Sequence, residues 1–493
     1  MGIEIEKIDF DEADRSAFAI RLEQNLAVLQ QMLDDPSFGE GPGSLGAELE
    51  MYVVDAAGHP LHANEEILAA AQDPQLTLEL NRYNLEYNLS PYALADSAFA
   101  STEREILARM DNLRAVAAPL GGRIAAIGIL PTLRQTDFGA HCITGCRRYH
   151  ALVNQLIKRR GDKFRIDING EDPLKLELAD VTLEGANTSF QVHYRVRPAD
   201  FADTFNAIQL VTPLAIAIGA NSPTLFGHRL WQETRIPLFK QSIDTRHADR
   251  YSWREPARVN FGQGWARRGA AELFREVVRI YPPLLPVCAE QVQLDQRAEG
   301  AAPALSELRL HQSTVWLWNR PIYDDVGGGH LRIEMRTLPA GPTAVDMVAN
   351  AAFLIGLAEG IRPHLEEMLP ALPFSQAEYN FYRAAQHGLD AKLLWPDLRQ
   401  TGYREQSLCD LIERLLPVAR QGLDTIGVGA AESERYIGVI EQRLRRRQTG
   451  ASWQLQKMAQ LQRKMPLYEA QHALLEVFME HSAANLPVAE WPL

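Results

Sequence analysis

Charged and apolar residues alternate along four separate segments of this 493-residue chain, and the alternation limits the possible folds more than any other feature. The first segment, GAELEMYVVD, begins at Gly46. In an extended strand it places Glu48 and Glu50 on one face and apolar residues on the other, because successive side chains point to opposite faces. Two carboxylates so close together repel each other, so the pattern raises the question of what compensates them.

The same alternation recurs in three further segments, RYNLEYNLSP, TSFQVHYRVRP and GGGHLRIEMRTLP. If all four pair in one sheet, their apolar faces form a core and their polar faces form one surface. For any single segment, the solvated face of an antiparallel sheet is the commoner explanation. The combination of Glu, His and Arg across the four favours a functional surface. Its expected members are Glu48, Glu50, Glu86, His193 and Glu334, surrounded by Arg195, Arg332 and Arg336.

Carboxylates and an imidazole on one surface are typical ligands of hard divalent cations. A pair of Mg²⁺ or Mn²⁺ ions would offset the repulsion, and Mg²⁺ in proteins usually shares its coordination shell with phosphate oxygens. Nearby arginines suit the negative charge of a phosphoryl group in transfer. The chain contains no G-x-x-x-x-G-K-[ST] sequence. The residues therefore predict metal-assisted phosphoryl chemistry on a sheet and not on a P-loop.

Strands grouped in the middle of the chain, with helices around and after them, predict an α+β fold with an antiparallel sheet covered on one face. We expect one catalytic domain over residues 1–493, with a sheet-bearing core at about 40–345 and a helical region at about 346–493. The expected strands, after the first segment, are Tyr83–Leu89 (closed by Ser90 and Pro91), Ile124–Leu130, Phe164–Ile168, Thr188–Val196, Ser313–Trp318 and His330–Thr337. The expected helices are Asp11–Leu33, Thr102–Ala118 behind a capping box, Arg147–Arg159, Phe205–Ala220, Ala344–Gly360, Gln406–Gly422, Ser433–Arg446 and Trp453–Gln462.

Composition and charge indicate in which compartment the protein acts and which kinds of partner it can bind. The net charge is −13 and no large basic block is present, which argues against a nucleic-acid surface. The apolar run Phe205–Ala220 is interrupted by Gln209, Thr212 and Pro213, so it predicts a buried helix and no membrane partner. The N-terminus lacks the basic and apolar regions of a signal peptide. With only four cysteines in the chain, these features predict a cytoplasmic protein.

Six short motifs resemble a known family in their order and spacing: GAELE, LEYNLSP, TSFQVHYRV, GANSPTLFG, HLRIEMRTLPAGPTAVD and GASWQ. From about Gly46 to Gln454, the chain resembles the second glutamate–cysteine ligase family, which includes bacterial carboxylate–amine ligases of the glutamine-synthetase-like superfamily. The resemblance implies a curved antiparallel sheet that holds the active site. There ATP phosphorylates a carboxylate, typically the γ-carboxylate of glutamate, and an amine displaces phosphate to form an amide.

The resemblance also implies cofactors, partners and residue roles. Two or three Mg²⁺ (or Mn²⁺) ions would bridge the nucleotide phosphates, the substrate and the sheet, with ATP and small amino acids as partners. Formation of a homo-oligomer is left open. The implied metal ligands are Glu48, Glu50, Glu79, Glu86, His193 and Glu334. The implied catalytic arginines are Arg336 and Arg332, and the implied substrate-binding residues are Arg235, Arg148 and Gln191. The segment Arg229–Arg235 departs from the family pattern, so the resemblance does not define the substrates.

Two other functional classes compete with a ligase. A phosphagen-type kinase would use the same sheet without forming an amide, and an inactive paralogue would bind nucleotide or metal without turnover. Retention of the whole Glu, His and Arg set argues against the inactive paralogue. Among the remaining features, the His and Cys spacing at residues 141–150 is a weak zinc signal. The cluster from Arg443 to Arg447 favours a solvated helix end, and Gly327–Gly329 favours a hairpin loop.

Overall fold

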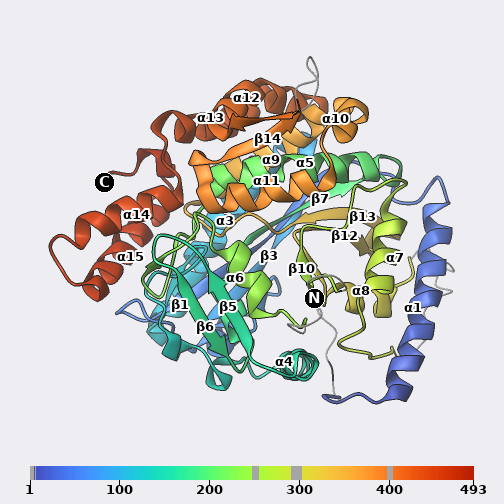
Figure 1. Ribbon diagram of the computed structural model, residues 1–493, viewed down its shortest axis with the longest axis horizontal. Helices are drawn as coiled ribbons and strands as arrows, with labels where there is room; N and C mark the ends of the chain where they lie inside the picture. The colour runs from blue at the N-terminus through green and yellow to red at the C-terminus, as the bar shows by residue number, and fades with distance from the viewer. Residues whose placement is uncertain (1–4, 6, 247–254, 290–301, 397–402) are drawn as a thin grey trace.

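The computed structural model describes residue 5 and residues 7–246, 255–289, 302–396 and 403–493. A seven-stranded sheet crosses the middle of the molecule in the order β12-β13-β7-β1-β3-β2, with β4 beside β1 (Figure 1). All of its pairings are antiparallel. Its strands are β1 Ser44–Val54, β2 Leu76–Leu78, β3 Asn84–Ala93, β4 Arg123–Ala125, β7 Phe190–Val196, β12 Asn319–Asp324 and β13 His330–Met335. The predicted α+β class with a curved antiparallel sheet is confirmed.

The four alternating segments form β1, β3, β7 and β13, which are direct neighbours in the sheet. The register places Glu50 opposite Glu86 and Glu334 opposite His193. Glu48 lies opposite Gln191 on the adjacent strand. The sheet that the alternation predicts is therefore present, and its polar residues share one face.

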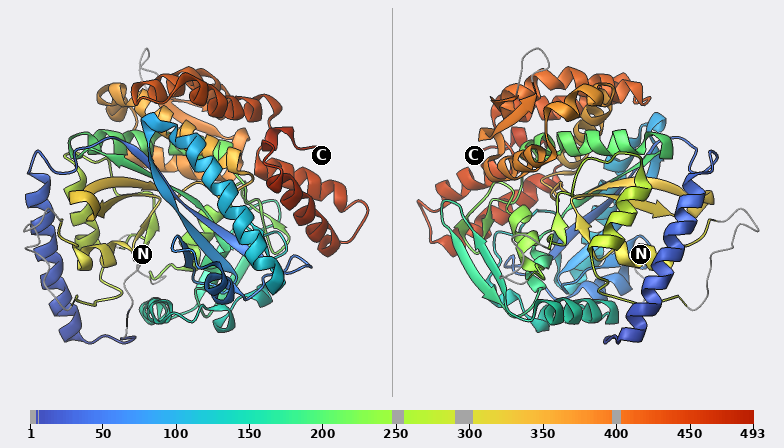
Figure 2. Two further views of the ribbon diagram at one scale, coloured as in Figure 1. Left: turned by 180° about the vertical axis from the view of Figure 1, so that it is seen from behind. Right: turned by 45° about the vertical axis from the view of Figure 1, so that its right-hand side comes forward.

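The other face of the sheet is packed against helices. Apolar residues of all four strands, such as Met51, Leu85, Val192 and Ile333, are buried in one large core. The helices that contact the strands are α3 Ala98–Ala117, α5 Phe201–Gly219 and α9 Ala344–Ile361. Packed on α5 and α9 are α11 Phe374–His387, α12 Leu408–Thr425 and α13 Ala430–Arg446. Figure 2 shows α3 lying along the back of the sheet. The predicted helical C-terminal region is confirmed.

Helices α5 and α9 are long and apolar enough to cross a membrane, judged by length and composition alone. Within Pro198–Gly219 and Ala344–Ala371, however, 89% and 94% of the most apolar windows are buried inside the protein. The polar residues of α5 are satisfied there: Gln209 donates to the carbonyl of Phe261, and Asn319 donates to Gln209. Both helices are core helices, as predicted for Phe205–Ala220.

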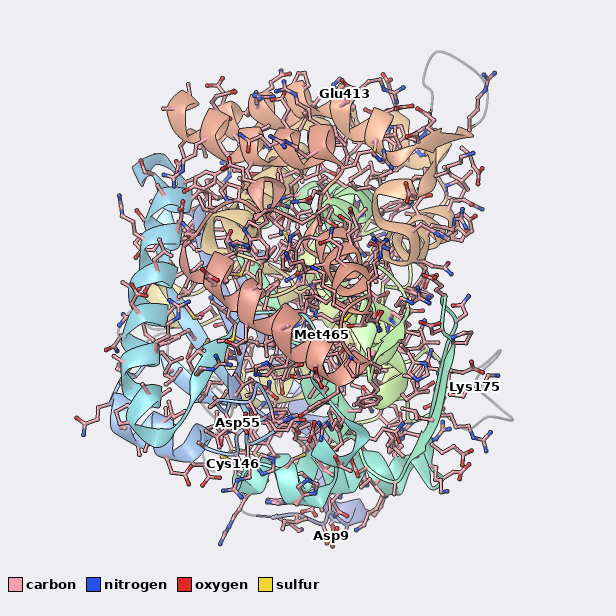
Figure 3. All side chains as sticks on the ribbon, turned by 90° about the vertical axis from the view of Figure 1, so that its left-hand side faces the viewer. Asp9, Asp55, Cys146, Lys175, Glu413 and Met465 are labelled. Atoms are coloured by element: carbon pink, nitrogen blue, oxygen red, sulfur yellow. The ribbon has the colours of Figure 1, made fainter. Side chains whose placement is uncertain are left out.

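A second layer lies over the polar face of the sheet. It contains α4 Arg147–Arg160, the hairpin of β5 Phe164–Ile168 and β6 Leu174–Leu178, the 3-10 helix η5 Thr182–Ala186, and α6 Arg235–Ser242. Lys175 marks this hairpin at the edge of the molecule in Figure 3, and Met465 marks the turn between two C-terminal helices. The remaining helices are α1 Glu12–Leu33, α2 Asn64–Ala71, α7 Ala270–Ile280, α8 Ser306–Gln312, α10 Leu365–Ala371, α14 Gly450–Leu461 and α15 Leu467–Ala483. Four short strand pairs complete the described chain: β5–β6, β8–β9 (Thr224–Leu225 and His228–Arg229), β10–β11 (Val259–Asn260 and Trp316–Leu317) and β14–β15 (Lys392–Pro396 and Tyr403–Ser407).

Several predicted boundaries are wrong for identifiable reasons. Strand β3 continues through Ser90 and Pro91 to Ala93, because β1 stays paired with it to that point. Helix α3 begins at Ala98, so the hydroxyl of Thr102 donates to the carbonyl of Ala98 and caps nothing. The predicted strand Ile124–Leu130 shortens to the end of β4, and Ser313–Trp318 shortens to β11. Apolar runs there reflect burial in irregular chain and not strand pairing.

Arg443 contradicts the predicted solvated cluster at the end of α13. Its side chain is buried and pairs with Asp346 of α9 at 3.0 Å. It also donates to the Asn350 side chain at 2.5 Å and to the carbonyl of Ile218. Arg443 thus joins α13 to α9 and α5, whereas Arg445 is exposed. A charged residue at the core-facing position of a helix can be told from a solvated one only when its partner is known.

Candidate active site on the polar face of the sheet

Glu334 lies at the centre of a buried charge cluster. Arg320, opposite it on the edge strand β12, donates to both carboxylate oxygens, at 2.9 and 3.0 Å. Arg336 donates to one of these oxygens from Nε and Nη2, at 2.9 and 2.6 Å. The Nε2 of His193 lies 3.2 Å from Glu48 and 4.0 Å from Glu334. Strand pairing alone therefore brings together four of the polar residues that the sequence pattern groups, together with Arg320.

Gln191 connects this cluster to Glu50. Its side-chain carbonyl accepts a hydrogen bond from Nη2 of Arg336 at 2.9 Å, and its amide donates to Glu50 at 2.8 Å. The backbone N–H of Ser189 donates to the second oxygen of Glu50 at 2.7 Å. An unbroken chain of polar contacts thus runs from Glu334 to Glu50, and it fixes the amide orientation of Gln191.

Carboxylates crowd together beyond Glu50. Glu86 accepts from the Thr77 hydroxyl and from the Asn88 amide, both at 3.2 Å. Burial, then the charges of Glu48 and Glu50, raise the pKa of Glu86 well above its ordinary value. Burial and the neighbouring carboxylates, Glu86 foremost, likewise raise the pKa of Glu79. Burial and mutual repulsion thus both disfavour the charged forms of these two carboxyl groups.

Glu184 of η5 faces the same group from the second layer. Burial, then the charge of Glu50, raise the pKa of Glu184 to about 7, against the opposing charge of Arg336. Burial also raises the pKa of Glu50, although the charges of Arg235 and Arg336 offset part of the effect. Four acidic side chains from three segments therefore interact electrostatically here.

The charge balance is reversed around Glu334. Burial alone would raise the pKa of this carboxyl group, but the positive charges of Arg320 and Arg336 outweigh burial and hold the pKa well below its ordinary value. Burial likewise acts against the charged form of Glu48, and His193 outweighs it, so the pKa of Glu48 is also lowered. Glu334 is thus fully ionised and neutralised by the protein itself.

The other predicted residues lie around this centre. Arg235 is buried at the start of α6, where it pairs with Glu233 at 3.0 Å and donates to the carbonyls of Thr337 and Arg336. Arg332 lies one step further along β13 and pairs with Asp324 at 2.9 Å. Arg148 reaches from α4 to the hydroxyl of Ser313 at 3.5 Å. Arg332 and Arg148 are therefore at the margin of the cluster, and Arg235 supports it through the backbone.

Two residues of the cluster escaped the sequence analysis. Arg320 alternates with apolar residues in NRPIYD, but Pro321 interrupts the run and argues against a central strand. Proline is compatible with an edge strand, and β12 is one. Glu184 lies in a short 3-10 helix, which has no periodic signal in the sequence. The alternation at Arg320 could have been found, whereas Glu184 required the structure.

The cluster has the chemistry of a divalent-cation site, although its geometry is not yet that of one. Within the described ranges, no three His, Cys, Asp or Glu side chains are arranged to hold a metal ion. The chemistry fits because Glu79, Glu86 and Glu184, near Glu50, have raised pKa values. In addition, Nδ1 of His193 is buried without a hydrogen-bond partner among the described residues, and its Nε2 lies 3.2 Å from Glu48. Oxygen and imidazole donors of this kind suit Mg²⁺ or Mn²⁺.

Two surface cavities lie elsewhere and contain none of these residues. One, of about 440 Å³, is lined by α3 and the end of β3. The other, of about 680 Å³, lies between the β5–β6 hairpin and α6, and Lys240 and Tyr382 are among its lining residues. The candidate site is therefore identified from its converging side chains.

The chain resembles several known proteins. A glutamate–cysteine ligase from Francisella tularensis, solved in complex with AMP, is 15% identical, with 92% of this chain and 96% of that chain covered and a TM-score of 0.45. A bifunctional glutathione synthetase from Pasteurella multocida is 13% identical, with coverages of 94% and 54% and a TM-score of 0.46. A curated relative from Nocardia farcinica, provisionally named glutamate–cysteine ligase 2-2, is 29% identical over 147 residues. That match spans 28% of this chain and only 36% of the relative.

The family comparison covers far more of the sequence. The model of glutamate–cysteine ligase family 2 matches residues 44–472, from the start of β1 into α15. This range contains every predicted site residue and the whole sheet. The chain therefore belongs to glutamate–cysteine ligase family 2.

Proposed function

We propose that the protein is an ATP-dependent carboxylate–amine ligase, similar to glutamate–cysteine ligase, that acts as one catalytic domain in the cytoplasm. It would activate a carboxylate as an acyl-phosphate and form an amide, with release of ADP and phosphate. One observation carries the proposal. The pairing of β1, β3, β7 and β13 brings together, on one face of the sheet, Glu48, Glu50, Glu86, His193, Glu334 and Arg336. Family membership supports the proposed activity, and the four free cysteines are consistent with the proposed cytoplasmic location.

The residues of this face would have different roles, in metal binding and in phosphate binding. Glu48, Glu50, Glu79, Glu86, His193 and Glu334 would hold two or three Mg²⁺ or Mn²⁺ ions. When bound, these ions neutralise phosphate charge. The guanidinium of Arg336 is fixed by Glu334 and Gln191, so it can offer a preorganised positive charge to the transferred phosphoryl group. Arg332 lies on the same strand face and is a second candidate for phosphate.

The amino-acid substrate is proposed to bind near α4 and α6. Arg148 has a hydrogen-bond partner in Ser313 but no carboxylate partner among the described contacts, so its charge is available to a substrate carboxylate. Arg235 is held by Glu233 and by two backbone carbonyls, which favours an indirect role beside the substrate. Gln191 is placed to orient Glu50 and Arg336 while facing the same space.

A phosphagen-type kinase would use the same face, and product analysis separates the two activities. The purified protein should be incubated with ATP, Mg²⁺ and pairs of amino acids, with phosphate release measured. A ligase releases phosphate only, or much faster, when both a carboxylate donor such as glutamate and an amine are supplied. A kinase transfers phosphate to its acceptor without this dependence on a second substrate. Unchanged phosphate release across all amine additions, with a phosphorylated acid as product, would refute the ligase.

A further inference from the structure

Two guanidinium groups hydrogen-bond to the carboxylate of Glu334. Arg336 donates to Oε1 from Nε and Nη2, whereas Arg320 donates to both oxygens. Among the described residues, Oε2 accepts a hydrogen bond only from Arg320, at 3.0 Å. Oε2 also lies 4.0 Å from Nε2 of His193. Arg320 on β12 and His193 on β7 therefore flank Glu334 from opposite neighbouring strands, and Arg320 neutralises a carboxylate that also faces another proposed metal ligand.

The position of Arg320 is built into the fold. It lies directly opposite Glu334 in the β12–β13 pairing. A third donor, Nη1, binds the carbonyl of Gln312 at 3.2 Å, and only 12% of the side chain is exposed. A buried guanidinium needs an anionic partner, since an unpaired charge there is costly. It can exchange one anion for another, but it cannot simply swing into solvent.

We propose that Arg320 competes with a divalent cation for Glu334 and passes to a phosphate of the nucleotide when cation and nucleotide bind together. The inference rests on the proposed function, because it assumes that both ligands use this face. A phosphate offers the planar guanidinium the same bidentate partner as a carboxylate. Once Arg320 has this new partner, it no longer neutralises Glu334, and Oε2 is released from its hydrogen bond to Arg320.

The exchange couples the two ligands. In the absence of nucleotide, Arg320 weakens cation binding because it neutralises Glu334 already. In the presence of nucleotide, this competition ends, so each ligand raises the affinity for the other by the same factor. Arg320 is thus a positioning residue, and because of it the site without nucleotide binds a divalent cation weakly.

Mn²⁺ binding to the full-length protein, followed by electron paramagnetic resonance of the free ion, tests the inference without turnover. Without nucleotide, Arg320→Gln is expected to bind Mn²⁺ about tenfold more tightly than the wild type, within the usual range of coupling between ligands. ADP should tighten Mn²⁺ binding about tenfold in the wild type and much less in Arg320→Gln. The matched control is Arg309→Gln, which removes an exposed arginine paired with Asp325 and should change neither value.

The possible failures are distinguishable. Equal Mn²⁺ affinities of the wild type and Arg320→Gln, with and without ADP, would overturn the role of Arg320 and leave the proposed function intact. No Mn²⁺ binding to any variant, even with ADP, would refute the metal-dependent function itself. Circular dichroism melting shows whether Arg320→Gln folds. If it does not, Arg320→Lys decides, because it keeps the charge but loses the second donor: a smaller tightening of Mn²⁺ binding supports the competition, and no change overturns it.

Discussion

The polar face has two halves, one around Glu334 and one around Glu50 and Glu86, and the charge of the buried carboxylates is compensated differently in each. Around Glu334, the protein supplies its own cations, Arg320 and Arg336, and the pKa of Glu334 is lowered. In the other half, burial raises the pKa of Glu50 against the charges of Arg235 and Arg336, and burial together with Glu48 and Glu50 raises the pKa of Glu86. The first half is a completed ion-pair network, and the second has more carboxylates than neighbouring cations. The difference indicates where added cations stabilise the protein most.

Removal of one carboxylate from each half should give opposite stability effects. Glu334→Gln leaves two buried guanidinium groups without a full counter-charge, so we expect a loss of about 3–5 kcal/mol in the free energy of unfolding. Glu86→Gln relieves repulsion, so the metal-free protein should be as stable as the wild type or more stable. Urea denaturation in EDTA measures both. Equal losses in the two variants would show that the halves do not differ.

Replacement of Arg336 by Lys tests whether the completed half also serves catalysis. Lysine keeps the charge but loses the planar fork that binds Glu334 and Gln191 together. We expect kcat to fall by about a hundredfold or more, the range for a lost transition-state donor, with a smaller change in KM for ATP. Steady-state kinetics with the cognate substrates measure both constants. A kcat near that of the wild type would reduce Arg336 to an ion-pair partner and pass the phosphate role to Arg332 or Arg195.

Added cation should stabilise the protein through the second half. A ligand that binds only the folded state at one hundred times its Kd adds about 2.7 kcal/mol to the free energy of unfolding. We therefore expect Mg²⁺ or Mn²⁺ to raise the Tm of the wild type in a concentration-dependent way, and EDTA to reverse the rise. Glu86→Gln should show a smaller rise, whereas the exposed-site variant Arg309→Gln should behave as the wild type. A Tm that does not respond to either metal would contradict the proposed cation site.

The contrast between the halves also marks the limit of sequence analysis. Alternation with a period of two identified β1, β3, β7 and β13, because one face of each strand must be buried. It could not give the strand order or the register, and these bring Glu50 against Glu86 and Glu334 against His193. The alternation around Arg320 is interrupted by the neighbouring Pro321, so the strand is not predicted. Charges such as Glu184 and Arg443 depend on partners far away in the sequence, and no local pattern encodes those.

The pH dependence of stability isolates the contribution of Glu184. Its pKa is raised to about 7 in the folded protein by burial and then by Glu50, against an ordinary value of 4.5. The folded state therefore binds more protons than the unfolded state between these values, and stability falls as pH rises from about 4.5 to 7. Glu184→Gln cannot titrate, so in EDTA its free energy of unfolding should fall less steeply with pH than that of the wild type, while the exposed Glu66→Gln should match the wild type. Urea denaturation at several pH values gives the slopes. Identical slopes for wild type and Glu184→Gln would show that burial and the carboxylates of the sheet do not raise the pKa of Glu184.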